Sequence, residues 1–228
     1  MQEYDIHLYH KLVTLPLFQG LSRSELETIV GETKFGFHKY ESGQPIVVAD
    51  SPCTHLYFLL TGNLLVTTQA DDYSYQITEH ISTPDILQPE HLFGLTQRFS
   101  KTFTAETKCY VMSLDKNEIM KLSTEYAIFR MSLLNIISTK SQRMQHAPLR
   151  HVPENLKERI ARFVTDRCLR PAGPKTIKIK MQQLAEELND SRLDISRALN
   201  EMQDLGQLTL KRGYIIIPAL EHLGKPIT

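Results

Sequence analysis

The sequence predicts an α+β protein, with a β-rich N-terminal domain, a long helix and a mainly helical C-terminal domain. Residues 33–114 contain many short β-rich runs separated by Gly, Pro, Asp and Asn, which is typical of an antiparallel sandwich or roll. Residues 123–147 carry closely spaced apolar residues in a stretch long enough for one helix. The remaining residues combine helical patterns with strand-like runs, which indicates a separate small domain.

Composition places the chain among ordinary globular proteins. Of its 228 residues, 41% are hydrophobic and 23% are charged. The sequence has no apolar run of about 18 residues and no signal-peptide pattern at its start, so we expect a cytoplasmic protein without a membrane span. Cys53, Cys109 and Cys168 are far apart, and we expect free thiols in a reducing compartment.

The net charge of zero hides an asymmetry between the two parts of the chain. Residues 1–148 carry 12 Lys and Arg against 16 Asp and Glu, whereas residues 149–228 carry 14 against 10. The C-terminal part is therefore basic by four charges, which weakly favours an anionic partner for it.

Local patterns predict the individual elements. Ser22, with Glu25 three residues later, indicates a capping box that opens a short helix. The stretch 123–147 has no helix breaker before Pro148, and its first half is apolar on more than one side. One side is predicted to cover the β domain, and another is predicted to pair with a second chain. Pro153 suits the start of the following helix.

Six residues of the long helix are predicted to form the interface with the second chain. They are Phe129, Leu133, Ile136, Ile137, Lys140 and Met144.

The segment QQLAEELNDSRLDISRALNEM predicts a helix-turn-helix. Leu184, Ala185 and Leu188 line one face of its first helix, and Ile195, Leu199 and Met202 line one face of the second. Asn189 falls at the turn, where a left-handed residue is often needed, and Ser191 can cap the second helix. In this layout the second helix enters the major groove of DNA.

The residues around this helix pair favour DNA as its partner. Arg can bind guanine O6 and N7 with two hydrogen bonds, and an apolar side chain can contact a thymine methyl. A β-hairpin with a basic turn follows and completes a winged helix. A solvated face with two ordinary arginines is the alternative interpretation. The base-facing candidates are Arg192, Leu193, Ser196 and Arg197, and the phosphate-contact candidates are Gln182, Ser191, Lys211 and Arg212.

With these motifs the chain resembles the cyclic-AMP receptor protein and fumarate–nitrate regulator (Crp/Fnr) family of bacterial transcription factors. YESGQPI, LYFLLTGNLLV and PEHLFGL are similar to turns of the family's cyclic-nucleotide-binding β-roll, and SRLDISRALNEMQDLGQL is similar to its recognition helix. The resemblance implies a β-roll sensor domain in residues 1–123, a dimerisation helix in 124–148 and a winged helix-turn-helix in 149–228.

The resemblance also implies functional residues and departures from the family pattern. Arg192 and Arg197 match base-reading positions, whereas Leu193 replaces a Glu of the best-known members. Family members that bind cyclic nucleotides place Glu after the Gly of the phosphate loop and an Arg before a Ser or Thr. This chain has Gly94-Leu95 and Phe99-Ser100 at those places, which we assign as the effector pocket. We therefore expect an effector other than cyclic AMP.

These observations predict a homodimeric regulator that binds a palindromic double-stranded operator, with RNA polymerase as a candidate further partner. A signal received by the β-roll would change how the dimer helices pack. No catalytic residue, metal ligand or cofactor is assigned. A ligand-binding or metal-dependent cupin-like β-roll with a degenerate helix-turn-helix is the alternative, although the chain has no His-x-His pair. We interpret His91, beside the effector loop, as an ordinary histidine.

Overall fold

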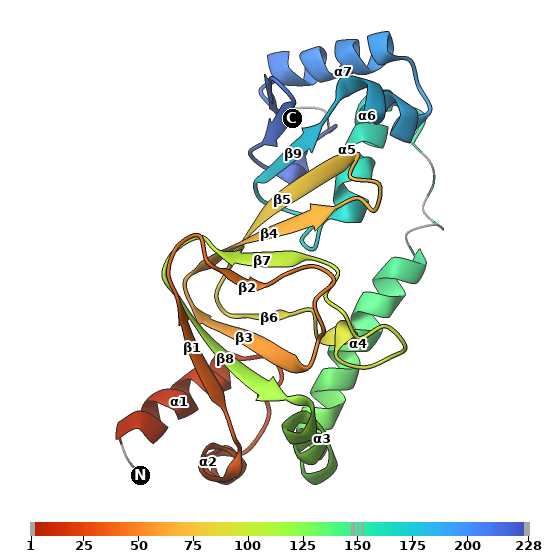
Figure 1. The fold of residues 1–228 in the computed structure, drawn as a ribbon. Helices are drawn as coiled ribbons and strands as arrows, with labels where there is room; N and C mark the ends of the chain where they lie inside the picture. Colours follow the sequence, from red (N-terminus) through yellow and green to blue (C-terminus); the bar gives the residue numbers. More distant parts are fainter. Residues whose placement is uncertain (1–2, 147–148, 150, 152, 226–228) are drawn as a thin grey trace. The chain divides into compact units, whose positions relative to one another are not determined.

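The chain forms two compact units. The computed structural model describes residues 3–146, 149, 151 and 153–225. Unit 1 comprises Met1–Leu64 and Ile81–Pro148, and unit 2 comprises Leu65–His80 and Leu149–Thr228 (Figure 1). Residues 65–80 lie inside the range 1–123 that the sequence assigns to the β-roll, yet they pack with the C-terminal residues. Pro148, expected in the linker, lies outside the described residues.

Unit 1 consists of helices before and after a set of short antiparallel strands. One sheet has the order β1-β8-β3-β6, and β2 pairs with β7. The elements are α1 (Glu3–Thr14), α2 (Arg23–Glu32), β1 (Gly36–Tyr40), β2 (Pro45–Val47), β3 (His55–Thr61), β6 (Asp85–Leu87), η1 (Pro89–His91), β7 (Thr102–Ala105), β8 (Cys109–Asp115), α3 (Lys116–Glu125) and α4 (Ala127–His146).

Three aromatic side chains from distant parts of the sequence meet in the core of unit 1. The ring of Phe18 lies 5.9 Å from that of Phe58 on β3 and 5.4 Å from that of Phe129 on α4. All three side chains are almost completely buried. Aromatic burial of this kind dominates core energetics, so α4 is anchored to the strands through its first turn.

Local geometry confirms the predicted capping box and shows one turn that requires glycine. The Ser22 side chain accepts from the backbone N–H of Glu25, whose side chain accepts from Ser22 N. Gly62, between β3 and β4 (Asn63–Gln69), has φ of 97°, and a Cβ there would lie 2.6 Å from the backbone oxygen of Lys108. Only glycine fits this close approach without displacing the backbone.

The expected unbroken helix over 123–147 is interrupted. Tyr126 has an extended conformation that ends α3, and α4 begins at the next residue. The guanidinium of Arg130 donates to the backbone oxygen of Ser123 at 2.8 Å. This bond satisfies one of the carbonyls left open at the end of α3, which offsets the cost of the break.

Unit 2 joins the hairpin of β4 and β5 (Tyr75–Ser82) to the C-terminal residues. Its further elements are α5 (Leu156–Arg167), β9 (Lys175–Ile179), α6 (Met181–Leu188), α7 (Arg192–Asp204), β10 (Thr209–Lys211), β11 (Tyr214–Ile217) and η3 (Leu220–His222). The strands follow the order β10-β11-β9-β5-β4, and β5 and β9 lie side by side in Figure 1. Ile160, Phe163, Ile177, Leu184 and Leu199 lie in one buried core.

The predicted start of α5 at Pro153 is wrong by three residues. The helix begins at Leu156, and the side chain of Asn155 accepts from the backbone N–H of Lys157 at 2.9 Å. Asn is among the best N-cap residues because its oxygen satisfies an otherwise open donor, and this advantage outweighs the preference of proline for a first helical position.

The core of unit 2 should be sensitive to loss of side-chain volume on α7. Leu199 is completely buried, so Leu199→Ala should lower the free energy of unfolding by about 2–5 kcal/mol. Leu205, 45% exposed, is the matched control, and Leu205→Ala should cost about 0.5 kcal/mol or less. Urea unfolding of both variants measures the difference, and equal losses would show that α7 does not pack in this core.

Candidate nucleic-acid interface

The turn between α6 and α7 has the geometry that a helix-turn-helix needs. Asn189 has φ of 49°, and the next residue, Asp190, donates from its backbone to the oxygen of Ala185 at 3.0 Å. Ser191 then caps α7, accepting from the backbone N–H of Asp194 at 3.0 Å. The buried Ala185 lets the two helices cross closely. The predicted left-handed residue and the predicted cap are both confirmed.

Helix α5 fixes this turn from the other side. Arg159 donates to the backbone oxygen of Leu188 at 2.6 Å and to the carboxylate of Asp190 at 3.0 Å. Charge-assisted hydrogen bonds of this kind are roughly twice as strong as neutral ones. The end of α6 and the turn are therefore held to α5 while α7 presents its outer face.

The outer face of α7 carries the residues that the sequence singled out. Arg192 is exposed, the side chain of Leu193 is 68% exposed, and Ser196 is half-buried. The opposite face is buried through Ile195 and Leu199. Because the buried face anchors the helix, the exposed face is free to meet another molecule.

Arg197 is exposed but already has a partner on its own helix. Its guanidinium lies 3.2 Å from one carboxylate oxygen of Asp194, and the other oxygen accepts from the Ser191 hydroxyl at 2.6 Å. Asp194 is the third residue of α7, where a carboxylate also favours the positive end of the helix dipole. This placement explains a negative side chain beside residues expected to meet phosphates.

The wing is a tight hairpin next to the start of α6. Arg212 and Gly213 connect β10 to β11, and Gly213 has φ of 78°. A groove of about 340 Å³ lies between this turn and α6. Its lining includes Lys180, Met181, Leu184, Lys211, Arg212 and Tyr214.

The predicted phosphate contacts are all exposed on these elements. Gln182 lies in the first turn of α6, where its amide donates to Glu186 at 3.1 Å, and Lys211 and Arg212 lie at the wing turn. Sequence reasoning missed Lys178 and Lys180, which are exposed beside the wing. The alternation of β9 contained this signal, because Ile177 and Ile179 point inward and their neighbours must point outward.

Comparison with known proteins agrees with this geometry. A model of the cyclic nucleotide-binding domain matches residues 37–126, and a model of the Crp-like helix-turn-helix domain matches residues 158–225. The cAMP-activated global transcriptional regulator Vfr of Pseudomonas aeruginosa is 21% identical over 191 residues, which cover 78% of this chain and 87% of Vfr.

The chain is also similar to solved structures. The sensor domain of the transcriptional regulator DNR from Pseudomonas aeruginosa matches with a TM-score of 0.54 and 17% identity, covering 68% of this chain and 99% of that domain. The catabolite activator protein of Thermus thermophilus matches with a TM-score of 0.47 and 17% identity, covering 89% of this chain and 93% of that protein.

The chain belongs to the Crp/Fnr family. It is a Crp-like transcription regulator with a helix-turn-helix DNA-binding domain. The family resemblance drawn from the sequence motifs is thereby confirmed.

In this member of the Crp/Fnr family, the four residues assigned to the effector pocket differ in exposure and in their contacts. Leu95 is fully exposed next to Gly94, whereas Phe99 is 2% exposed and packs with its ring 6.2 Å from that of Tyr57. Ser100 is exposed, and its hydroxyl accepts from the Gln88 amide at 2.6 Å. Leu95 is therefore in contact with solvent, whereas Phe99 packs in the interior.

A buried glutamine ties the two ends of this region together. Gln88 is 2% exposed, and its side-chain oxygen accepts from the backbone N–H groups of Ser100 at 3.2 Å and Lys101 at 3.3 Å. Arg98 does not face this polar cluster, because its guanidinium donates to the backbone oxygen of Asp50. The backbone N–H groups of Ser100 and Lys101 therefore already have a protein partner.

The six predicted dimer residues separate into two groups. Phe129 and Leu133 are buried in the core of their own chain, and the Lys140 amine pairs with Glu90 of the same chain at 2.6 Å. Ile136 and Ile137 are half-buried, and Met144 is 73% exposed. On α4, the exposed large apolar residues outside the predicted set are Ile128, Met131 and Leu134, which are 41%, 53% and 50% exposed.

Two of the three cysteines, Cys53 and Cys109, are buried. Burial raises the pKa of Cys53 to about 11 and also raises that of Cys109, so both thiols stay protonated near neutral pH.

Among the described residues, no group of three or more His, Cys, Asp and Glu side chains could hold a metal ion. Within the same residues, no helix is both long and apolar enough to cross a membrane.

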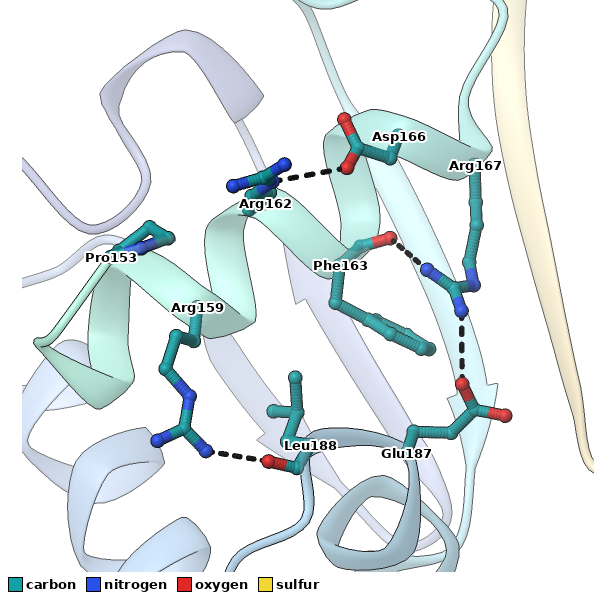
Figure 2. Close-up of a pocket in the computed structure, with 8 residues that line it drawn as sticks. All are labelled: Pro153, Arg159, Arg162, Phe163, Asp166, Arg167, Glu187 and Leu188. Carbon is teal, nitrogen blue, oxygen red and sulfur yellow. Dashed lines mark hydrogen bonds and ion pairs between the residues drawn. The ribbon is translucent and has the colours of Figure 1, made fainter. Parts of the chain in front are cut away.

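A second cavity, of about 240 Å³, lies between α5 and the end of α6 (Figure 2). Arg159, Arg162 and Arg167 line it, and each pairs with a carboxylate. Arg162 lies 3.3 Å from Asp166, and Arg167 lies 2.9 Å from Glu187. Arg159 and Arg167 therefore connect α5 to the turn and to the end of α6, whereas Arg162 pairs within α5.

Proposed function

We propose that the chain acts as a homodimer that binds a palindromic operator through α7 and the wing, under the control of an effector other than cyclic AMP. The observation that carries this proposal is the outward placement of Arg192, Leu193 and Arg197 on a helix whose opposite face is buried. The exposed basic turn of the wing, Lys211 and Arg212, supplies phosphate contacts beside it.

The pairing of Arg197 with Asp194 does not prevent base recognition. An exposed ion pair contributes about 0–1 kcal/mol, whereas a bidentate contact between Arg and guanine discriminates by about 1–3 kcal/mol. It is therefore favourable for the Arg197 guanidinium to leave Asp194 and bind guanine O6 and N7. Leu193 can contact a thymine methyl, which a Glu at that position could not do.

Arg197 and Arg212 should affect DNA binding in different ways. With an operator selected from random duplexes, Arg197→Ala should weaken binding by about 1–3 kcal/mol and have little effect on scrambled DNA. Arg212→Ala should weaken binding to both DNAs alike and lower the salt dependence. Titration of both DNAs at several salt concentrations measures this. Equal losses on both DNAs for Arg197→Ala would contradict its base-reading role.

The dimer is proposed to form along α4, on the side that its own chain leaves uncovered. Met131 and Leu134 are about half exposed and lie near each other on this helix, and Met144 is exposed near its end. Ile136 and Ile137 lie at the border of this surface and remain proposed contacts. A second copy would remove these side chains from water, which is the main driving force for association.

A charge on this surface should break the dimer. Leu134→Asp would bury an unpaired carboxylate in the interface, so sedimentation at micromolar concentration should show a monomer, and operator affinity should fall. Met120→Asp is the matched control, because Met120 has a similar exposure, 51%, and lies on α3 rather than on α4. If Leu134→Asp still sediments as a dimer, the interface lies elsewhere.

The effector loop supports a ligand other than a cyclic nucleotide. The relative Vfr is described as cAMP-activated, but here Leu95 offers no hydrogen bond, and Phe99 offers no charge. The arrangement of Gln88 with Ser100 and Lys101 already satisfies backbone donors of this loop. An anionic phosphate would lose hydration here without a charge-assisted contact in return.

Cyclic AMP and cyclic GMP should therefore have no effect on this regulator. We expect calorimetry to detect no binding of either nucleotide at about millimolar concentration. A dissociation constant at this level corresponds to a binding free energy of about −4 kcal/mol. We also expect no change in operator affinity. Micromolar binding of either nucleotide, abolished by Arg98→Ala or Lys101→Ala, would overturn this expectation and identify a conventional nucleotide sensor.

A further inference from the structure

The DNA-binding unit contains a strand pair that spans about a hundred residues of sequence. Strand β5 pairs antiparallel with β9 at five successive positions, from Tyr75 opposite Ile179 to Glu79 opposite Lys175. On its other side β9 pairs with β11 of the wing. The hairpin therefore converts β9 from an edge strand to an interior strand of this sheet (Figure 1).

The hairpin also contributes side chains to the core of the unit. Ile77 is completely buried in the same cluster as Ile177 and Phe163, and the ring of Tyr75 lies 5.3 Å from that of Phe163 in an edge-on arrangement. Removal of the hairpin would expose apolar surface on β9 and α5, and would leave the outer hydrogen-bonding groups of β9 without a strand partner.

A buried ion pair locks the far end of this strand pair. Glu79 and Lys175 are 0% and 1% exposed, and their charged groups lie 3.3 Å apart. The Glu79 carboxylate also accepts from the backbone N–H groups of Leu169 at 2.7 Å and Arg170 at 3.1 Å. The Lys175 amine donates to the backbone oxygen of Ala172 at 2.9 Å. Each charge requires the other, because a buried charge without its partner is strongly destabilising.

A third set of contacts connects the hairpin to the helix-turn-helix itself. Arg167 of α5 donates to the Tyr75 hydroxyl at 2.8 Å and to the carboxylate of Glu187 on α6 at 2.9 Å. Its guanidinium also lies 4.0 Å from the centre of the Phe163 ring. A displacement of the hairpin would therefore act on α5 and α6, which hold the recognition helix.

We propose that the hairpin of residues 65–80 is a permanent strand pair of the DNA-binding unit and the element through which unit 1 acts on the winged helix. The chain enters the hairpin from β3 and leaves it toward β6, so both ends of the hairpin continue into unit 1. None of its contacts described above uses Arg192, Arg197 or Arg212. The hairpin thus stays in place when DNA is bound. Only the part of this proposal that concerns the DNA-bound state rests on the proposed function.

A designed disulfide tests whether the hairpin remains in place. Thr78 and Thr176 are directly opposite in the register, where Cα atoms of paired strands lie about 4.5–5.5 Å apart, within the range for a disulfide. Thr78→Cys/Thr176→Cys is made in a Cys168→Ser background, which leaves the buried Cys53 and Cys109. We expect the disulfide to form under mild oxidation, with operator affinity within about twofold of the reduced protein.

Several outcomes would overturn the proposal, and the single-cysteine variants serve as controls. Failure of the two cysteines to cross-link would show that the strands are not paired in solution. A fall in operator affinity of about tenfold or more on oxidation, reversed by reduction, would show that the hairpin must leave for DNA to bind. Disulfide formation is measured without DNA. A failure of the strand pairing can therefore be distinguished from a failure of the proposed function.

The ion pair provides a second test by hydrogen exchange in the full chain. Lys175→Met leaves the Glu79 carboxylate buried without its cation, so exchange of the amides of β5 and β9 should accelerate by about tenfold or more, and operator affinity should fall. Glu79→Gln/Lys175→Met removes both charges and should restore protection and operator affinity. Lys178→Met, an exposed position on the same strand, should leave protection unchanged. Unchanged exchange in Lys175→Met, or unchanged operator affinity where exchange accelerates, would refute the coupling role of this hairpin.

Discussion

The left-handed residue Asn189 and the clamp around it determine where α7 points. Arg159 holds the end of α6 and Asp190, and Ser191 begins the new helix, so the angle between the two helices is fixed by hydrogen bonds on both sides of one residue. The buried face of α7 then requires Leu193 and its neighbours to face outward. The direction of the exposed side chains of α7 therefore depends on this turn together with the buried face of the helix.

Unit 2 has the DNA-binding elements of the family, whereas the effector loop of unit 1 departs from the family's sequence pattern. Unit 2 keeps the recognition helix and wing of the Crp/Fnr family, whereas the loop after η1 places Leu95 in solvent and Phe99 in the core. Gln88 fills the polar space between the two ends of this loop. These features are the basis of the proposal that the effector is not a cyclic nucleotide.

Local patterns in the sequence predicted the elements well, and long-range contacts were the main omission. The capping box at Ser22, the turn at Asn189 and the wing at Gly213 depend on neighbouring residues, and each is confirmed. The pairing of β5 with β9 depends on residues about a hundred positions apart. The sequence does contain one indication of this pairing, because Glu79 and Lys175 each occupy an inward position of an alternating strand. The burial of Phe129 likewise depended on Phe18, which no helical pattern contains.

The central claim is that two copies of α7 read two halves of one operator. The most direct measurement is recovery of genomic DNA by the full-length protein, followed by sequencing, beside the Arg197→Ala variant. The account predicts an inverted repeat whose half-site centres lie about 10–10.5 base pairs apart or a multiple of this spacing, enriched with the unaltered protein alone. Recovery of fragments without a common sequence, or of the same sequences with the variant, would contradict it.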